Sequence, residues 1–227
     1  MKSNPSLYGV PAASTFGLDY LASLDHIVIR QRTEMVEVFL GCETKNKYRV
    51  LDPYGRQIFY AKEDTDICTR QCCGAIRPFD MILTDESDQE VIHFNRPLRC
   101  GSCCYPCCLQ EIEIQSPAGI VVGSMEQKWS IFIPKFYVKD AAGQVAFYIE
   151  GPCWTASCCG SDVEFKIYDP SKSIELGAIL KKWSGCIKEC YTDADNFEIH
   201  FPLNLNVRMK TVLLGACMLI DFMFFEK

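Results

Sequence analysis

Residues 211–225, close to the C-terminal end of the chain, limit its possible folds more than any other feature. They read TVLLGACMLIDFMFF, and the single charged residue among them is Asp221. A helix of this sequence has no polar face, so apolar material must surround it on all sides. That material is either lipid or the rest of the protein.

Length favours protein over lipid as the surroundings of this helix. The fifteen residues from 211 to 225 would span about 22 Å as a helix, whereas a bilayer core is about 30 Å thick. Extending the helix backwards meets Lys210 and Arg208, and extending it forwards meets Glu226. Asp221 near the membrane centre would add a cost of about 2.5–3.5 kcal/mol. We therefore predict a helix that fills a β-barrel, with a single membrane span as the alternative.

Strand signals dominate the rest of the chain. Residues 26–30 and 35–40 are β-branched and aromatic runs with polar borders, which predict strands. A unit also recurs in which an apolar segment, an Asp, a tight turn and a second apolar segment follow one another. Asp caps a tight turn and Gly supplies positive φ, so each copy predicts a β-hairpin. The copies lie at residues 50–60, 82–94, 138–148 and, more loosely, 167–174.

A longer internal repeat predicts that these strands close on themselves. Residues 123–130 match residues 177–184, a period of 54 residues that is typical of a supersecondary unit. An open sheet with so many strands would leave edges that invite aggregation. The predicted fold class is therefore mainly β, a closed antiparallel barrel around a buried C-terminal helix.

The net charge and the first residues of the chain argue against several classes of protein. A net charge of −6 argues against a nucleic-acid-binding module and restricts any contact with an anionic membrane to a local patch. The first residues show no secretory signal, and Lys2 is incompatible with N-myristoylation. Residues 1–16 are expected to form a short disordered lead and residues 17–227 the folded domain.

Cysteine is the most unusual component of the composition. The chain has fifteen cysteines, an odd number, and without an export signal we expect reduced thiols. Five of them fall within nine residues, between two strand-like stretches: Cys100, Cys103, Cys104, Cys107 and Cys108.

Three interpretations of this cluster remain open. Thioester acylation of several neighbouring cysteines would give the multi-chain anchor that stable membrane attachment requires. The spacings Cys100-x2-Cys103 and Cys104-x2-Cys107 are compatible with zinc. The cysteines can also be small buried hydrophobic residues. The spacing favours acylation, because a well-separated second pair and a nearby His are missing for zinc.

An enzyme is not expected. The sequence contains no Gly-x-Ser-x-Gly elbow, no phosphate-binding glycine loop and no His-Glu-x-x-His pair.

Several motifs together resemble the phospholipid scramblase family. They occur in order from about residue 17 to the C-terminal end: Gly17–Leu21, Arg96–Cys100, Gln110–Gln115, Gly151–Cys153, Asp193–Phe197 and Gly215–Glu226. The resemblance implies a tubby-like fold, a barrel of about twelve strands that encloses a central helix.

The resemblance also implies an activity and a location. The activity is calcium-triggered, ATP-independent movement of phospholipids in both directions across a bilayer. Palmitate would be carried by the cysteine cluster, at Cys103, Cys104, Cys107 and Cys108 and also at Cys100. The protein would lie at the cytoplasmic face of the plasma membrane or at an intracellular membrane such as the mitochondrial one. Protein partners and a calcium-induced oligomer are further expectations. The alternative function is a palmitoylated, membrane-tethered adaptor that binds lipid or protein without translocating lipid.

The calcium segment of the family corresponds to residues 193–204, with Asp193, Asp195, Phe197, Ile199, Phe201 and Asn204 at the ligand positions. Phe197 stands where an EF-hand has an oxygen ligand, and Asn204 stands where a bidentate carboxylate closes the site. Phe197, Ile199 and Phe201 also alternate as in a strand. A weak calcium site and a turn followed by a barrel strand are therefore both open.

The segment that matches a nuclear-import signal in scramblases contains Lys181 and Lys182. Two lysines are usually a solvated edge, so nuclear import is the less favoured interpretation.

Overall fold

The computed structural model describes residues 17–32, 45–99, 109–153, 161–183 and 195–226. Its helical elements are η1 (Asp19–Ser23), α2 (Ile67–Cys73), η2 (Gly74–Ile76) and α4 (Val207–Phe224). Its strands are β1 (His26–Gln31), β2 (Lys47–Leu51), β3 (Gln57–Asp64), β4 (Phe79–Thr84), β5 (Glu90–Arg96), β6 (Glu111–Gln115), β7 (Val121–Lys128), β8 (Lys135–Asp140), β9 (Val145–Glu150), β10 (Val163–Tyr168), β11 (Glu175–Lys182) and β12 (Asn196–His200).

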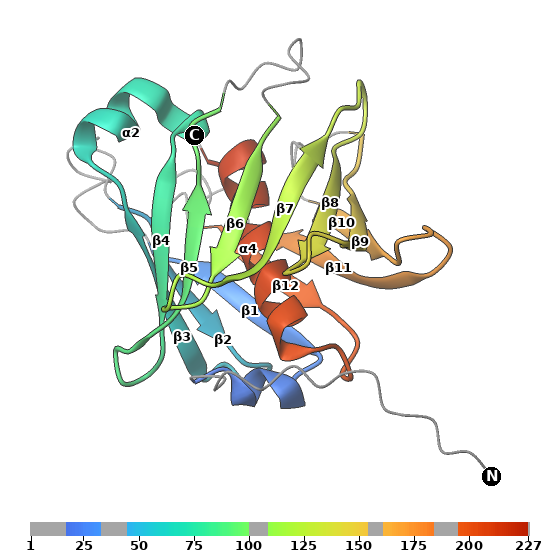
Figure 1. Cartoon of the computed structure of the whole chain (residues 1–227), viewed down its shortest axis with the longest axis horizontal. Coiled ribbons are helices and arrows are strands. Elements are labelled where there is room, and N and C mark those ends of the chain that lie inside the picture. Colours follow the sequence, from blue (N-terminus) through green and yellow to red (C-terminus); the bar gives the residue numbers. More distant parts are fainter. Residues whose placement is uncertain (1–16, 33–44, 100–108, 154–160, 184–194, 227) are drawn as a thin grey trace.

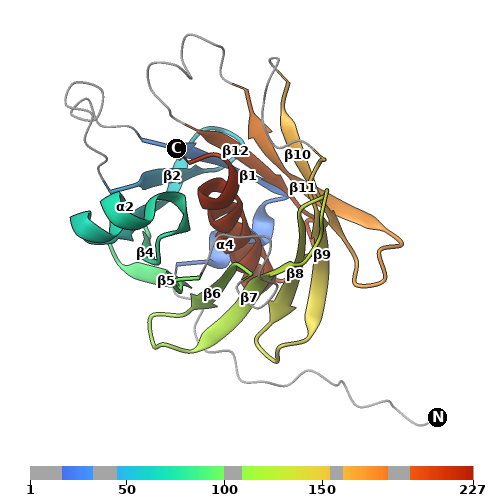
Figure 2. The same ribbon diagram turned by 90° about the horizontal axis from the view of Figure 1, so that it is seen from above.

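The strands form a closed barrel. Within the described residues, each of the twelve strands pairs antiparallel with the next one along the chain, and β1 pairs with β12 as well as with β2. Seen from above, the strands surround α4 on all sides (Figure 2). The predicted fold class, a closed antiparallel barrel around a C-terminal helix, is confirmed.

The Asp turns build the hairpins as predicted. Asp52 accepts hydrogen bonds from the backbone amides of Tyr54 and Arg56, both at 2.9 Å, between β2 and β3. Asp140 does the same for the amides two and four residues ahead, between β8 and β9. Gly55 and Gly143 take positive φ in these turns, 83° and 74°, which costs little without a side chain.

The other two predicted hairpins are also present, β4 with β5 around Asp85 and β10 with β11 around Asp169. The strand predicted at residues 26–30 is β1. The strand predicted at residues 35–40 and the lead at residues 1–16 lie outside the described residues. The two copies of the internal repeat contribute β7 and β11, which are both eight residues long with a glycine at the third position.

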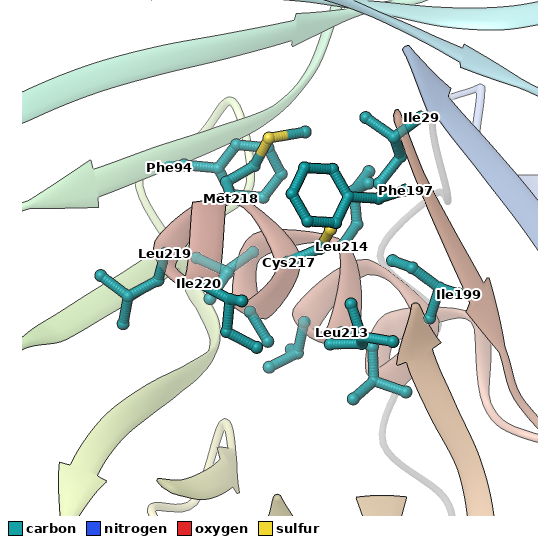
Figure 3. Close-up of a cluster of buried hydrophobic side chains, with 14 of the residues drawn as sticks. Ile29, Phe94, Phe197, Ile199, Leu213, Leu214, Cys217, Met218, Leu219 and Ile220 are labelled. Atoms are coloured by element: carbon teal, nitrogen blue, oxygen red, sulfur yellow. The ribbon is translucent and has the colours of Figure 1, made fainter. Parts of the chain in front are cut away.

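Helix α4 fills the barrel. It begins earlier than the predicted residue 211, because Asn206 accepts a hydrogen bond from the amide of Arg208 at 2.8 Å and so caps the helix. Residues 210–222 are all buried. Figure 3 shows Leu213, Leu214 and Cys217 of the helix among inward-facing side chains of β1, β5 and β12. The apolar helix is therefore surrounded by protein.

Among the helices that the structure describes, none combines the length and the apolar character that crossing a bilayer would require.

Lys210 enters the core at the start of α4. Its side chain is wholly buried, and its ammonium donates hydrogen bonds to four backbone carbonyls: Leu21 at 2.9 Å, Ala22 at 3.3 Å, Leu24 at 2.6 Å and Leu203 at 3.0 Å. Burial lowers the pKa of Lys210. These bonds tie η1 and the β12–α4 turn to the helix, so this end of the barrel is closed by a buried cation.

Candidate functional site

The two ends of the barrel are built differently. At one end, here called the turn end, short turns join β2 to β3, β4 to β5, β6 to β7, β8 to β9 and β10 to β11. At the other, here called the connection end, the chain joins β1 to β2, β3 to β4, β5 to β6, β7 to β8, β9 to β10 and β11 to β12. Figure 1 shows α2 and the C-terminal end of α4 at the connection end, and η1 at the turn end.

Cysteines gather in the segments of the connection end. By sequence position, fourteen of the fifteen cysteines lie in the chain between strands that are joined there, and the remaining one is Cys217 in α4. They are Cys42 between β1 and β2; Cys68, Cys72 and Cys73 between β3 and β4; Cys100, Cys103, Cys104, Cys107 and Cys108 between β5 and β6; Cys153, Cys158 and Cys159 between β9 and β10; and Cys186 and Cys190 between β11 and β12.

The described cysteines fall into two environments. Cys68 and Cys72 are exposed on α2, and Cys153 is exposed after β9. Cys217 is buried in the core, where burial raises the pKa of its thiol. Exposed thiols can be acylated or oxidised, whereas the Cys217 thiol is shielded. The five cysteines from Cys100 to Cys108 lie outside the described residues, so acylation, zinc binding and packing at this cluster stay predictions.

The two ends of the segment that carries this cluster are held together. The buried guanidinium of Arg96, at the end of β5, donates to the side-chain oxygen of Gln110 at 2.7 and 3.2 Å. Burial lowers the pKa of Arg96 to about 10. Arg99 forms an ion pair with Glu111, at the start of β6. Arg96 and Gln110 belong to the motifs that resemble scramblases, and their contact gives both a structural role.

A layer of buried charge closes the barrel at the connection end. Arg77 donates to Glu63 through Nε at 2.8 Å and through a terminal nitrogen at 3.1 Å, and it also pairs with Glu226 beyond α4. Asn46 donates to Glu226 at 2.7 Å. Burial opposes the charge of Arg77, but its two carboxylate partners outweigh burial and raise the pKa of Arg77. Burial raises the pKa of Glu226.

Asp221 lies beneath this layer, near the C-terminal end of α4. Its Oδ2 accepts a hydrogen bond from the hydroxyl of Tyr48 at 2.6 Å, while its Oδ1 has no hydrogen-bond partner in the structure. Burial raises the pKa of Asp221 well above its ordinary value, and the nearby carboxylates of Asp195 and Glu226 raise it further. The surroundings therefore favour the neutral form of this carboxyl over the charged form. Sequence reasoning treated Asp221 only as a cost in a membrane and did not find this layer.

One signal of the layer could have been found in the sequence. Glu63 follows Phe59 and Ala61 at the two-residue spacing of the inward face of β3, and all three are buried. A carboxylate at an inward position requires a partner. Its partner Arg77 comes after α2, a helix that the sequence did not predict.

The structure separates the residues at the calcium-ligand positions. Asp195 precedes β12 and forms an ion pair with Lys181 at 2.8 Å, while Asn204 is exposed beyond the other end of β12. The five residues of β12 hold them roughly 17 Å or more apart. Phe197, Ile199 and Phe201 are buried in the core.

Asp193 lies outside the described residues. Within the part of the chain that the structure describes, no three His, Cys, Asp or Glu side chains are grouped so that they could hold a metal ion. The alternative of a barrel strand at residues 196–200 is therefore what is observed, and calcium binding by this segment stays a prediction.

The two lysines of the nuclear-import segment lie on β11. Lys181 is nearly buried in its pair with Asp195, and Lys182 pairs with Asp162 at 2.7 Å and with Glu198 at 3.8 Å. Recognition of Lys181 by an import receptor would require the loss of that ion pair, and nuclear import stays a prediction.

Comparison with known proteins gives consistent matches. The family model described as Scramblase matches residues 4–227. Phospholipid scramblase 1 of Homo sapiens is 51% identical over 210 residues, which cover 92% of this chain and 66% of that protein. Phospholipid scramblase 2 of Bos taurus is also 51% identical over 210 residues, which cover 92% of this chain and 71% of that protein. Phospholipid scramblase family member 5 of Homo sapiens is 45% identical over 210 residues, which cover 92% of this chain and 77% of that protein.

The chain spans between 63% and 66% of the length of the phospholipid scramblase 1 proteins that it matches, from Mus musculus, Homo sapiens and Rattus norvegicus. Among solved structures, a protein from Arabidopsis thaliana matches with a TM-score of 0.46 and 9% identity, over 92% of this chain and 99% of that chain.

Proposed function

This chain belongs to the phospholipid scramblase family, and on that premise we propose that it mediates calcium-dependent, ATP-independent movement of phospholipids in both directions across a bilayer. The observation that carries the proposal is the identity of 51% to a protein named phospholipid scramblase 1, over 92% of the chain. The proposed movement breaks and forms no covalent bond in the lipid, so no catalytic residue is assigned.

Attachment to the membrane is proposed to occur at the connection end. Palmitate on Cys103, Cys104, Cys107 and Cys108, and also on Cys100, supplies several acyl chains, whereas a single chain binds only marginally. The gathering of fourteen cysteines in segments of this end supports the proposal, as does the exposure of Cys68, Cys72 and Cys153. The proposed location is the cytoplasmic face of the plasma membrane or an intracellular membrane.

Calcium is proposed as the trigger, through residues 193–204. Asp195 forms an ion pair with Lys181 at 2.8 Å, so a calcium ion at Asp195 would have to displace the Lys181 ammonium. The variant Lys181→Met removes this competitor, and it should lower the calcium concentration that is needed for activity. An unchanged calcium dependence in this variant would place the trigger elsewhere.

Reconstitution tests lipid movement directly. The purified chain is placed in liposomes that contain fluorescent phospholipid, and dithionite is added outside with and without calcium. The expected result is quenching beyond the outer-leaflet fraction, faster with calcium and unaffected by ATP. Protein-free liposomes are the control, and identical traces from both preparations would contradict the proposal.

A second function is favoured by the packing of the barrel interior. Val212, Leu214 and Ile220 of α4 are fully buried against the strands, so apolar side chains pack the middle of the described barrel, between Lys210 at one end and the buried charge layer at the other. Such an interior suits a palmitoylated adaptor that is tethered to a membrane and does not itself translocate lipid.

Cysteine substitution tests the membrane anchor that both functions share, and the liposome assay separates the two functions. In cells, replacing Cys103, Cys104, Cys107 and Cys108 with Ser should release the protein from membranes under both proposals. Membrane retention through these cysteines, combined with no lipid movement in liposomes, would select the adaptor. Membrane retention of the substituted variant would contradict the proposed anchor.

A further inference from the structure

The connection between β7 and β8 exposes a short apolar segment. Residues 129–134 read Trp-Ser-Ile-Phe-Ile-Pro. Trp129 is 49% exposed, Ile131 69% and Phe132 74%. Three large apolar side chains within four residues, all open to solvent, are unusual on a protein surface unless they contact an apolar partner.

This segment projects from a fixed base. At the end of the hairpin Lys128 of β7 lies directly opposite Lys135 of β8. The amide of Gly151, just after β9, donates to the carbonyl of Pro134 at 2.8 Å and ties the segment to the neighbouring hairpin. Lys128 donates to the hydroxyl of Tyr137 at 2.6 Å. The apolar tip therefore stands on a base with two lysines.

The segment adjoins the proposed acylated connection. The amide of Gln127 in β7 donates to the carbonyl of Gln110 at 2.8 Å, and Gln110 is where the segment from Cys100 to Cys108 returns to the barrel. Leu98, on the other side of that segment, is 61% exposed, and Trp183 after β11 is 37% exposed. The exposed segment after β7 and Leu98 thus lie next to the cysteine-rich connection, while Trp183 adds an exposed apolar side chain elsewhere at the same end.

The turn end also exposes apolar side chains, but they are distributed differently. Tyr54, Ile174 and Leu203 are exposed in separate turns, and Ile120 lies in another turn next to Val121 at the start of β7. None of these turns gathers three large apolar side chains as residues 129–132 do. The turn end therefore provides matched control positions of similar exposure.

We propose that residues 129–133 insert into the interfacial region of a phospholipid bilayer. Ile131 and Phe132 enter the acyl boundary, because each side chain gains from leaving water. Trp129 lies at headgroup level, where its amphipathic ring is favoured. Lys128, which bonds the Tyr137 hydroxyl, and Lys135, which pairs with Glu150 at 3.6 Å, exchange these partners for lipid phosphates at the membrane surface. This inference rests on the proposed function in one respect, that the connection end faces a membrane.

Depth-dependent quenching tests the insertion. The full chain is held on vesicles of phosphatidylcholine and phosphatidylserine through a histidine tag at residue 1 and a nickel-chelating lipid, so that acylation is not needed. Trp129→Phe, Trp154→Phe and Trp183→Phe remove the natural tryptophans. Phe132→Trp then reports from the tip and Ile174→Trp from the turn end. Brominated acyl chains should quench Phe132→Trp several-fold more strongly than Ile174→Trp. Equal quenching, or stronger quenching of Ile174→Trp, would overturn the inference.

Vesicle partitioning of the untagged, unacylated chain is the second measurement. Replacing Ile131 and Phe132 with Ser should weaken partitioning by about tenfold or more, since two apolar side chains no longer leave water. Ile120→Ser with Ile174→Ser is the matched control and should partition as the unaltered chain does. Both pairs are surface positions, and matching melting temperatures verify that the variants fold. The inference would be contradicted if only the control lost partitioning, or if neither variant did. It would also be contradicted if residues 129–133 bound a protein partner and not vesicles.

The test of insertion and the test of lipid movement can fail independently of each other. Strong quenching of Phe132→Trp together with no lipid movement in liposomes would remove translocation and leave the insertion intact. Lipid movement together with no quenching of Phe132→Trp would remove the insertion alone.

Discussion

Lys210 and Asp221, near opposite ends of α4, are kept inside the barrel by different physical means. Lys210 has four backbone carbonyls around its ammonium, which replace water as hydrogen-bond acceptors. Asp221 has one donor, Tyr48, and one oxygen without a partner. Burial raises the pKa of Asp221, because it disfavours the charged form of the carboxyl.

This difference predicts how stability depends on pH. The pKa of Asp221 is higher in the folded than in the unfolded chain, so the folded state keeps a proton that the unfolded state has released. The resulting stabilisation is complete below the ordinary value of 3.8 and is lost as pH rises toward the folded-state pKa. Asp221→Asn does not titrate. Relative to the unaltered chain, it should gain stability with rising pH, by up to about 1.4 kcal/mol per pH unit.

Denaturant unfolding at several pH values between the ordinary Asp pKa and neutrality checks this slope. The difference in unfolding free energy between the variant and the unaltered chain is compared, because the contributions of other titrating groups, such as Glu226, cancel in that difference. Tyr48→Phe retains Asp221 and is the matched control, so it should keep the pH slope of the unaltered chain. If the difference in stability between Asp221→Asn and the unaltered chain stays constant with pH, the claim that the folded-state pKa of Asp221 is raised would be refuted.

At the scale of elements, the contact between α4 and β6 depends on the absence of a side chain at Gly215. A Cβ at this position would lie 2.7 Å from Cγ1 and 3.0 Å from Cδ1 of Ile114, and 3.1 Å from Phe94. Gly is unfavourable inside a helix by about 1 kcal/mol relative to Ala. The close approach of helix and barrel wall therefore outweighs helix propensity at Gly215.

The variant Gly215→Ala tests which effect is larger. Overpacking costs about 1–3 kcal/mol and opposes the gain of about 1 kcal/mol in helix propensity, so we expect a net loss of up to roughly 2 kcal/mol of unfolding free energy. Ile114→Ala provides space for the new methyl group. In that background the cost of Gly215→Ala should vanish, and chemical denaturation of the four chains of this double-mutant cycle measures the coupling. A stabilising Gly215→Ala in the unaltered background would mean that the helix is less tightly enclosed.

The elements that could be predicted from the sequence are those with a local cause. The Asp52 and Asp140 turns bond their own amides two and four residues ahead, so neighbouring residues suffice to identify them. The hairpin of β6 and β7 was not predicted, because Ser116 takes the place of Asp in its turn. The enclosure of α4 could be predicted because the helix has no polar face.

The buried charge layer could not be predicted from residues that are neighbours in the sequence. Arg77 and Glu226 are 149 residues apart in the sequence, and Tyr48 and Asp221 are 173 residues apart. Only closure of the barrel brings these pairs together. The family resemblance assigned Asp195 and Asn204 to one calcium segment, whereas β12 lies between them in the structure and separates them.

At the scale of the whole molecule, the up-and-down topology sorts the cysteines. Alternate connections of such a barrel meet at the same end, so segments far apart in the sequence share one face. Fourteen cysteines belong to these segments, and Cys217 is enclosed by the strands. Of the described cysteines, Cys68, Cys72, Cys73 and Cys153 lie in such connections, whereas Cys217 lies in the shielded interior.

Thiol labelling tests this arrangement. In the reduced native protein, iodoacetamide should modify Cys68, Cys72 and Cys153 rapidly, because they are exposed. Cys217 should react only with global unfolding, since it is buried and its thiolate is disfavoured. Pulse labelling across a denaturant series, read by mass spectrometry, should give Cys217 the same midpoint as the unfolding transition followed by fluorescence. Labelling of Cys217 well before that midpoint would show that α4 can leave an otherwise folded barrel.

The pairing of β1 with β12 has a consequence for synthesis of the protein. Of the described strands, β1 is synthesised first, yet one of its two partners is β12, which is synthesised last among them, and α4 follows β12. Until α4 has left the ribosomal exit tunnel, the growing chain is a series of hairpins whose inward-facing side chains have nothing to cover them. Nascent chains of this kind are prone to aggregate. Chaperones that shield apolar surface should therefore bind it throughout translation and release it only after the final helix is available.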